Sequence, residues 1–152
     1  MTIKVCRTGA SLSEFGSILA NNPSMKQHIL VVDDEVQIRE LLSIFLGKQG
    51  YTVSTAATSA ETLRIAAAQR LDLVVLDIGL AEEDGMNLLG TLKERFPATR
   101  VIMLTGMGFV EDLLEEAQQK GADGYVSKVL PLDELLQAIR RALEVRSIAE
   151  AC

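Results

Sequence analysis

The chain has 152 residues, which is enough for one ordinary domain with a proper hydrophobic core and too few for two of typical size. Hydrophobic residues make up 48% of the sequence, but aromatic residues only 4% and tryptophan is absent, so we expect an aliphatic core of the kind found in α/β folds. The formal net charge of -6 argues against nucleic acid as a direct partner and suits a protein that holds a cation.

The two cysteines, Cys6 and Cys152, lie near opposite ends of the chain and outside any metal-binding spacing. We interpret them as free thiols in a reducing compartment. No apolar run reaches the length that spans a bilayer, and the N-terminus lacks the charged-then-apolar layout of a secretion signal. We therefore expect a cytoplasmic protein without membrane insertion.

Residues 1–27 mix polar, glycine and proline residues with short apolar patches, and we expect a mobile N-terminal extension. Met25, directly before the first strong apolar run, is an alternative start of the protein. A further alternative is a short amphipathic arm that folds onto the body or a partner. It is suggested by four apolar residues at near-helical spacing: Leu12, Phe15, Ile18 and Leu19.

From residue 28 onward, short apolar runs alternate with longer segments of helical period, which is typical of strand and helix units around a parallel sheet. Thr58 and Glu61 predict a capping box, and Pro131 suits the first turn of the last helix. The expected strands are 29–33, 51–55, 72–77, 100–105 and 124–127. Three apolar stripes predict core-facing helices: Ile38, Leu41, Leu42 and Phe45; Val110, Leu113, Leu114 and Ala117; and Leu132, Leu135, Leu136, Ile139 and Leu143.

The five expected strands differ in polarity. The first, third and fourth are continuously apolar, whereas the second and fifth contain residues such as Thr52, Ser54 and Ser127. The second and fifth strands are therefore expected at the edges of the sheet. With right-handed crossovers this pattern is compatible with the strand order 2-1-3-4-5, in which the first and third strands are neighbours at the topological switch point.

Acidic side chains stand at the ends of two of the apolar runs, Asp33 and Asp34 after the first and Asp77 at the end of the third. In the predicted order these carboxylates meet at one edge of the sheet. They repel one another unless a cation neutralises them, and Mg²⁺ prefers such hard oxygen ligands. The sequence therefore predicts a magnesium site.

Thr105 and Lys128 end the fourth and fifth runs, so they are expected to reach the same edge and to offer a hydroxyl and an ammonium to phosphate oxygens. A metal ion at this edge can shield the charge of a carboxylate while that carboxylate attacks a phosphoryl group. Asp77 is the best candidate for this phosphoacceptor.

Four segments resemble response-regulator receiver domains of bacterial two-component systems. They are Ile-Leu-Val-Val-Asp33-Asp34-Glu35, the run from Asp77 to Asp84-Gly85, Leu104-Thr105-Gly106, and Gly121-Ala-Asp-Gly-Tyr125 followed by Lys128. The resemblance covers about residues 28–145. It implies a flavodoxin-like (βα)5 fold and a phosphoprotein of phosphorelay signal transduction. A sensor histidine kinase or a histidine phosphotransfer protein would phosphorylate Asp77, with Mg²⁺ as cofactor.

The resemblance also implies roles for single residues. Asp34 would bind magnesium directly, Asp33 would help through water, and the backbone carbonyl of Gly79 would supply a further ligand. Thr105 and Lys128 would contact the phosphoryl group. Thr105 would move toward the phosphate while Tyr125 moves inward and reshapes the surface read by a downstream protein. The alternative for Tyr125 is a half-buried aromatic on an edge strand.

The sequence departs from the family's pattern at two places. Val129 follows Lys128 where relatives have proline in a typically cis bond, and a non-proline cis bond costs about 2.5 to 4 kcal/mol. The Lys128–Val129 bond is thus expected to be trans or strained, which puts the aim of Lys128 in question. Ala81 replaces a common proline in the loop after Asp77, and Gly79 has no side chain to shield a phosphate. We therefore expect a comparatively accessible phosphoryl group.

The leading hypothesis is a stand-alone signalling receiver spanning residues 28–146, with a tail at 147–152 and no room for a DNA-binding or enzymatic output domain. It would act by protein contact, as a monomer or a phosphorylation-linked dimer, and would not be an enzyme. One alternative is a pseudo-receiver, an interaction module that does not switch. Another is an aspartate-nucleophile hydrolase, which is disfavoured because no second Asp lies two residues after Asp77.

Overall fold

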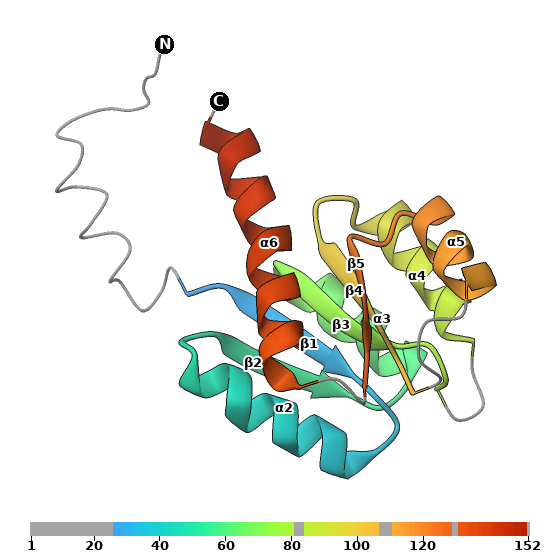
Figure 1. Cartoon of the computed structure of the whole chain (residues 1–152), viewed down its shortest axis with the longest axis horizontal. Coiled ribbons are helices and arrows are strands. Elements are labelled where there is room, and N and C mark those ends of the chain that lie inside the picture. Colours follow the sequence, from blue (N-terminus) through green and yellow to red (C-terminus); the bar gives the residue numbers. More distant parts are fainter. Residues whose placement is uncertain (1–25, 81–83, 107–110, 129–130, 152) are drawn as a thin grey trace, which may run out of the picture.

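The sheet has five parallel strands. A computed structural model describes residues 26–80, 84–106, 111–128 and 131–151, with only the backbone at 145–151. The strands are β1 (His28–Val32), β2 (Thr52–Ala56), β3 (Leu73–Asp77), β4 (Arg100–Thr105) and β5 (Gly124–Ser127), and they lie in the order β2-β1-β3-β4-β5 (Figure 1). The predicted order and the predicted edge strands are confirmed, with boundaries shifted by at most one residue.

Helices cover both faces of the sheet. They are α2 (Val36–Lys48), α3 (Ser59–Ala68), α4 (Gly85–Arg95), α5 (Glu111–Gln119) and α6 (Leu132–Ala151). Figure 1 shows α6 crossing in front of the strands, on the same side as α2, while α3, α4 and α5 lie behind them. This is the doubly wound, flavodoxin-like arrangement that was expected. The predicted tail at 147–152 begins inside α6, whose backbone stays helical to Ala151.

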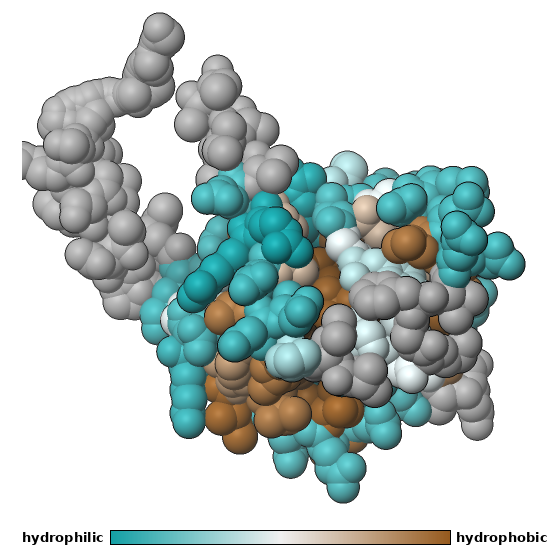
Figure 2. All heavy atoms as spheres, viewed as in Figure 1, coloured by the Kyte–Doolittle hydropathy of each residue, from teal (hydrophilic) through white to brown (hydrophobic). Residues whose placement is uncertain are grey.

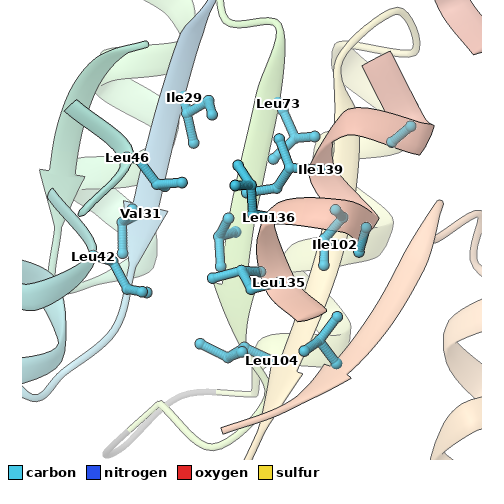
Figure 3. Close-up of a cluster of buried hydrophobic side chains, with 14 of the residues drawn as sticks. Ile29, Val31, Leu42, Leu46, Leu73, Ile102, Leu104, Leu135, Leu136 and Ile139 are labelled. Atoms are coloured by element: carbon cyan, nitrogen blue, oxygen red, sulfur yellow. The ribbon is translucent and has the colours of Figure 1, made fainter. Parts of the chain in front are cut away.

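Two aliphatic cores pack against the two faces of the sheet. Successive residues of β1 alternate between them, so that Ile29 and Val31 join Leu46 and Ile139 on the α2–α6 side (Figure 3). Leu30 and Val32 face the other way, toward α3, α4 and α5. Strand β3 is buried along its whole length, as the continuous apolar run predicted. Tyr51 packs against the first core and Tyr125, half-buried, against the second.

Leu41, a predicted core residue, is exposed and does not join the core. Its exposed fraction is 49%, because the buried face of α2 is centred on Leu42 and Leu46, and consecutive helical residues point about 100° apart. Val36 and Ile44 are also exposed. Among the described residues these three are the exposed large hydrophobic side chains, and Figure 2 shows hydrophobic atoms gathered where α2 lies in Figure 1. We call them the α2 apolar patch.

The predicted start of α3 is confirmed, with one difference in its cap. The hydroxyl of Thr58 accepts a hydrogen bond from the backbone N–H of Glu61 at 3.2 Å. The Glu61 carboxylate, however, accepts from Ala57 N at 2.8 Å and not from Thr58 N. The box is therefore extended by one residue and still satisfies a free donor at the helix start.

Some sequence-based expectations concern residues that lie outside the described part of the chain. They are the extension and possible arm at 1–25, Ala81, Val110, the Lys128–Val129 bond and Cys152. Within the described part, no helix combines the length and the hydrophobicity that crossing a bilayer requires.

Candidate functional site

The three aspartates expected to meet do lie together, at the carboxyl edge of the sheet. Asp33 and Asp34 directly follow β1, and Asp77 is the last residue of the neighbouring strand β3. Carboxylate oxygens of the three residues all lie within 4.8 Å of one another. Asp33 is fully buried, Asp77 is 3% exposed and Asp34 is exposed to solvent. The pairing of β1 with β3 creates this proximity.

The loop after β1 fixes the orientation of Asp33. Its Oδ1 accepts a hydrogen bond from the backbone N–H of Glu35 at 2.9 Å. Its carbonyl oxygen accepts from Nη1 of Arg39 at 2.7 Å, and its own N–H donates to Ala56 of β2 at 3.1 Å. Both the side chain and the backbone of Asp33 are therefore held by neighbouring elements.

The loop after β3 holds Asp77 in a similar way. Its Oδ1 accepts a hydrogen bond from the backbone N–H of Gly79 at 3.1 Å. Asp84 caps α4 by accepting from Met86 N at 3.0 Å, and Gly85 N donates to the carbonyl of Ile78 at 3.2 Å. The start of α4 is thus hydrogen-bonded to Ile78, the residue that follows Asp77.

Lys128 enters the same site from the end of β5. Its Nζ lies 2.9 Å from Oδ2 of Asp33, 3.1 Å from Oδ2 of Asp77 and 3.2 Å from Oε1 of Glu35. Its backbone N–H donates to the carbonyl of Thr105 at 2.7 Å. Thr105 ends β4 and is buried at the same edge. The side chain of Lys128 therefore points at the acidic cluster, whatever the bond to Val129.

Burial and charge act on the ionisation of this site. Burial raises the pKa of Asp77 above its usual value, and the nearby Asp33 carboxylate raises it further, while the Gly79 N–H and Lys128 lower it. Burial disfavours the charged form of Lys128, but attraction by Asp33 and Asp77 outweighs this effect and raises the pKa of its ammonium. Among the described residues, the ammonium of Lys128 contacts three carboxylates, those of Asp33, Asp77 and Glu35, and Asp34 adds a fourth carboxylate to the cluster. Negative charge is in excess.

The donor set fits a magnesium ion. Oδ2 of Asp33 is buried, and its contact among the described residues is the ion pair with Nζ of Lys128 at 2.9 Å. The cluster consists of carboxylate oxygens, which Mg²⁺ and Ca²⁺ prefer, whereas Zn²⁺ and Cu²⁺ favour nitrogen and sulfur ligands. A divalent cation would balance the excess charge and give the buried oxygen a second partner.

The roles of Glu35 and Gly85 in this site were not predicted from the sequence. Glu35 directly follows the aspartate pair and is therefore carried to the same edge. Gly85 is required at the start of α4 for a steric reason. A Cβ atom at Gly85 would lie 2.5 Å from the carbonyl oxygen of Asp77 and 2.7 Å from that of Ile78, so only glycine fits there without a backbone shift. Close backbone approach of this kind leaves no signal in a single sequence beyond the glycine itself.

Comparisons with known proteins agree with this description. The family model for the response regulator receiver domain matches residues 29–140. The chain is 38% identical over 117 residues to the transcriptional regulatory protein GlrR of Escherichia coli, covering 77% of this chain and 26% of GlrR. It is 34% identical to sporulation initiation phosphotransferase F of Bacillus subtilis, covering 81% of this chain and 98% of that protein.

A solved structure shows the same fold. The CheY-like response regulator receiver domain protein of Methanospirillum hungatei has a TM-score of 0.77 with this chain at 29% identity. The match covers 82% of this chain and 98% of that one. The chain spans about a quarter to a half of the length of the first curated relatives, which include longer transcriptional regulators. From the matched family model, the strand order and these similarities, the chain belongs to the response regulator receiver domain family of two-component signalling.

Proposed function

We propose that Asp77 is the phosphoacceptor of a magnesium-dependent receiver domain at residues 28–146, with Asp33, Asp34, Asp77 and the carbonyl of Gly79 as metal ligands. The observation that carries this proposal is the buried convergence of Asp33 and Asp77 in a site where four carboxylates gather and the ammonium of Lys128 contacts three of them. A core built for stability alone avoids such an excess of like charge. A site for a divalent cation and a phosphoryl group requires it.

Each residue has a definite task in the proposed transfer. A carboxylate oxygen of Asp77 forms a bond to phosphorus while the bond from phosphorus to the donor breaks, and the donor leaves with the electron pair. The carboxylates of Asp33, Asp34 and Asp77 would hold Mg²⁺, which would neutralise the charge of the carboxylates and of the phosphoryl group. The ammonium of Lys128, now 3.1 Å from Oδ2 of Asp77, neutralises a phosphoryl oxygen from the side of β5. The Thr105 hydroxyl donates to another.

The phosphoryl donor and the downstream partner that responds to phosphorylation are both proposed to be proteins. The α2 apolar patch lies on the helix that begins directly after the acidic loop, and Val36 and Ile44 border a hollow of about 480 Å³ together with Arg39, Glu40, Ser43 and Thr55. Exposed apolar surface beside a reactive group favours a protein partner. A sensor histidine kinase or a phosphotransfer protein fits this position, in agreement with the similarity to phosphotransferase F.

The output is proposed to pass through Thr105 and Tyr125 to a downstream protein. Thr105 is buried at the edge of the sheet that carries Asp77, and Tyr125 lies on the neighbouring strand with its ring against the α3–α4–α5 core. New hydrogen bonds from a phosphoryl group to Thr105 would favour a packing in which Tyr125 moves inward. Action as a single receiver is supported by the two relatives of which the chain covers 98%, whereas GlrR is much longer. The protein is proposed to be cytoplasmic, as is usual for this family.

Incubation with acetyl phosphate and Mg²⁺, followed by intact mass spectrometry, tests the proposal. The wild-type chain should gain one phosphate, and the signal should be absent with a chelator or in an Asp77→Asn variant. Asp84→Asn is a matched control, because asparagine caps helices as well as aspartate does. It should label normally. Unchanged labelling of Asp77→Asn, or no labelling of the wild type, would contradict the assignment.

A further inference from the structure

Glu35 contributes a third carboxylate to Lys128, on the solvent side of the site. Its Oε1 lies 3.2 Å from Lys128 Nζ, and its side chain is 57% exposed, whereas the side chains of Asp33 and Asp77 are 0% and 4% exposed. The backbone N–H of Glu35 donates to Oδ1 of Asp33, which ties its position to that of the buried aspartate. Nζ of Lys128 therefore contacts two buried carboxylates and the solvent-exposed carboxylate of Glu35.

Two of the carboxylates that Lys128 contacts also belong to the proposed metal-binding cluster. Its Nζ lies against Oδ2 of Asp33 and Oδ2 of Asp77, and both residues are members of that cluster. A divalent ion among these carboxylates would repel the ammonium and compete with it for the same two side chains. Glu35 lies outside that cluster of three aspartates, so its carboxylate stays free to hold the ammonium after a metal ion binds.

We propose that Glu35 is a positioning residue that receives the ammonium of Lys128 when the site takes up its metal ion. Lys128 then remains at the rim of the site, ready to contact a phosphoryl oxygen, and is not released into solvent. This inference rests on the proposed function of the site. Loss of the Glu35 carboxylate makes displacement of Lys128 less favourable and therefore weakens metal binding.

The size of the effect follows from the kind of contact. A partly exposed ion pair contributes about 0.2 to 1 kcal/mol, which corresponds to a change of up to about fivefold in affinity. Glu35→Gln should therefore weaken Mg²⁺ binding by about two- to fivefold. Glu35 also attracts Mg²⁺ directly through its charge, and this attraction does not depend on Lys128. The two contributions separate in a double-mutant cycle.

The test is calorimetric titration of Mg²⁺ into the wild-type chain and into Glu35→Gln, Lys128→Gln and the double variant. Lys128→Gln should tighten binding, because the competing ammonium is gone. In that background Glu35→Gln should change the affinity by less than about half as much as in the wild type. Glu40→Gln, an exposed acid one turn along α2, is the matched control for loss of one negative charge and should change the affinity least.

An equal effect of Glu35→Gln in both backgrounds, or no effect in the wild type, would overturn this inference while leaving the proposed function intact. A wild-type chain that binds no Mg²⁺ would overturn both. If Lys128→Gln fails to fold by circular dichroism, the side-chain carboxyl ¹³C signal of Glu35 in the wild type decides the matter. It should shift on saturation with Mg²⁺, and the inference fails if the Glu40 signal shifts as much.

Discussion

Two clusters of charged side chains occupy opposite edges of the sheet, and their charge balance differs. At the edge where β4 begins, the carboxylate of Asp123 lies 3.2 Å from Nζ of Lys93 and 3.5 Å from Nη1 of Arg100. It also accepts a hydrogen bond from Val101 N at 2.9 Å. One acid is matched by two cations there. At the edge where β1 and β3 end, which we call the acceptor edge, the ammonium of Lys128 contacts three carboxylates and Asp34 adds a fourth to the cluster.

This difference distinguishes the Asp123 ion cluster from the proposed metal-binding cluster. The Asp123 cluster joins neighbouring elements, since Val101 N donates to the Oδ2 of Asp123 and Asp123 N donates to the carbonyl of Val101, at 2.7 Å, and these bonds attach β4 to the start of β5. The acidic cluster has an excess of carboxylates, which the proposed Mg²⁺ would balance. Substitutions of the Asp123 cluster should therefore change stability alone, and those around the acidic cluster should change metal binding and phosphorylation as well.

The largest expected effect is steric and belongs to the acceptor edge. Gly85→Ala would place a Cβ atom against the backbone of Asp77 and Ile78, so the loop or α4 must shift. We expect the free energy of unfolding in urea to fall by about 2 to 3 kcal/mol. Gly90→Ala is the matched control in the same helix, since no atom lies within 4 Å of its added Cβ, and it should stabilise by about 0.5 to 1 kcal/mol. Equal effects of the two variants would show that the close approach is unimportant.

The second-largest expected effect concerns the Asp123 cluster, at the opposite edge of the sheet. Asp123→Ala removes the acceptor of Val101 N and the partner of two cations, and the free energy of unfolding should fall by about 2 kcal/mol. Mg²⁺ affinity, measured by calorimetry, should stay within about twofold of the wild type because the site is at the opposite edge. A large loss of Mg²⁺ binding in a folded Asp123→Ala variant would show that the two edges are not independent.

The smallest effect has the opposite sign. The raised pKa of Asp77 means that its ionised form is less stable in the folded chain than in the unfolded one, so the wild type loses stability as pH rises from the ordinary value of 3.8 through the folded pKa. Asp77→Asn lacks this titration. In a chelator at neutral pH the variant should be more stable than the wild type, and the gap should close below pH 3.8. Thermal unfolding across this pH range checks the sign, and a less stable variant at neutral pH would refute it.

The sequence alone predicted the sheet and most of the site, because both depend on local patterns. Continuous apolar runs distinguish central from edge strands, and residues at the carboxyl ends of neighbouring parallel strands must meet. The exposure of Leu41 was not predictable in the same way, since a helical stripe sets the buried face only to within about one residue. The contact of Glu35 with Lys128 spans 93 positions and depends on side-chain geometry. The close approach of Gly85 to the carbonyls of Asp77 and Ile78 depends on backbone geometry and was not predictable from the sequence either.

The placement of the two tyrosines has a consequence for optical work. With no tryptophan in the chain, ultraviolet emission comes from Tyr51 and Tyr125 alone. Tyr51 packs on the α2–α6 side of the sheet and Tyr125 on the α3–α4–α5 side. Each layer therefore carries its own intrinsic fluorophore, and a Phe substitution of either tyrosine leaves a chain whose emission reports on the other layer only.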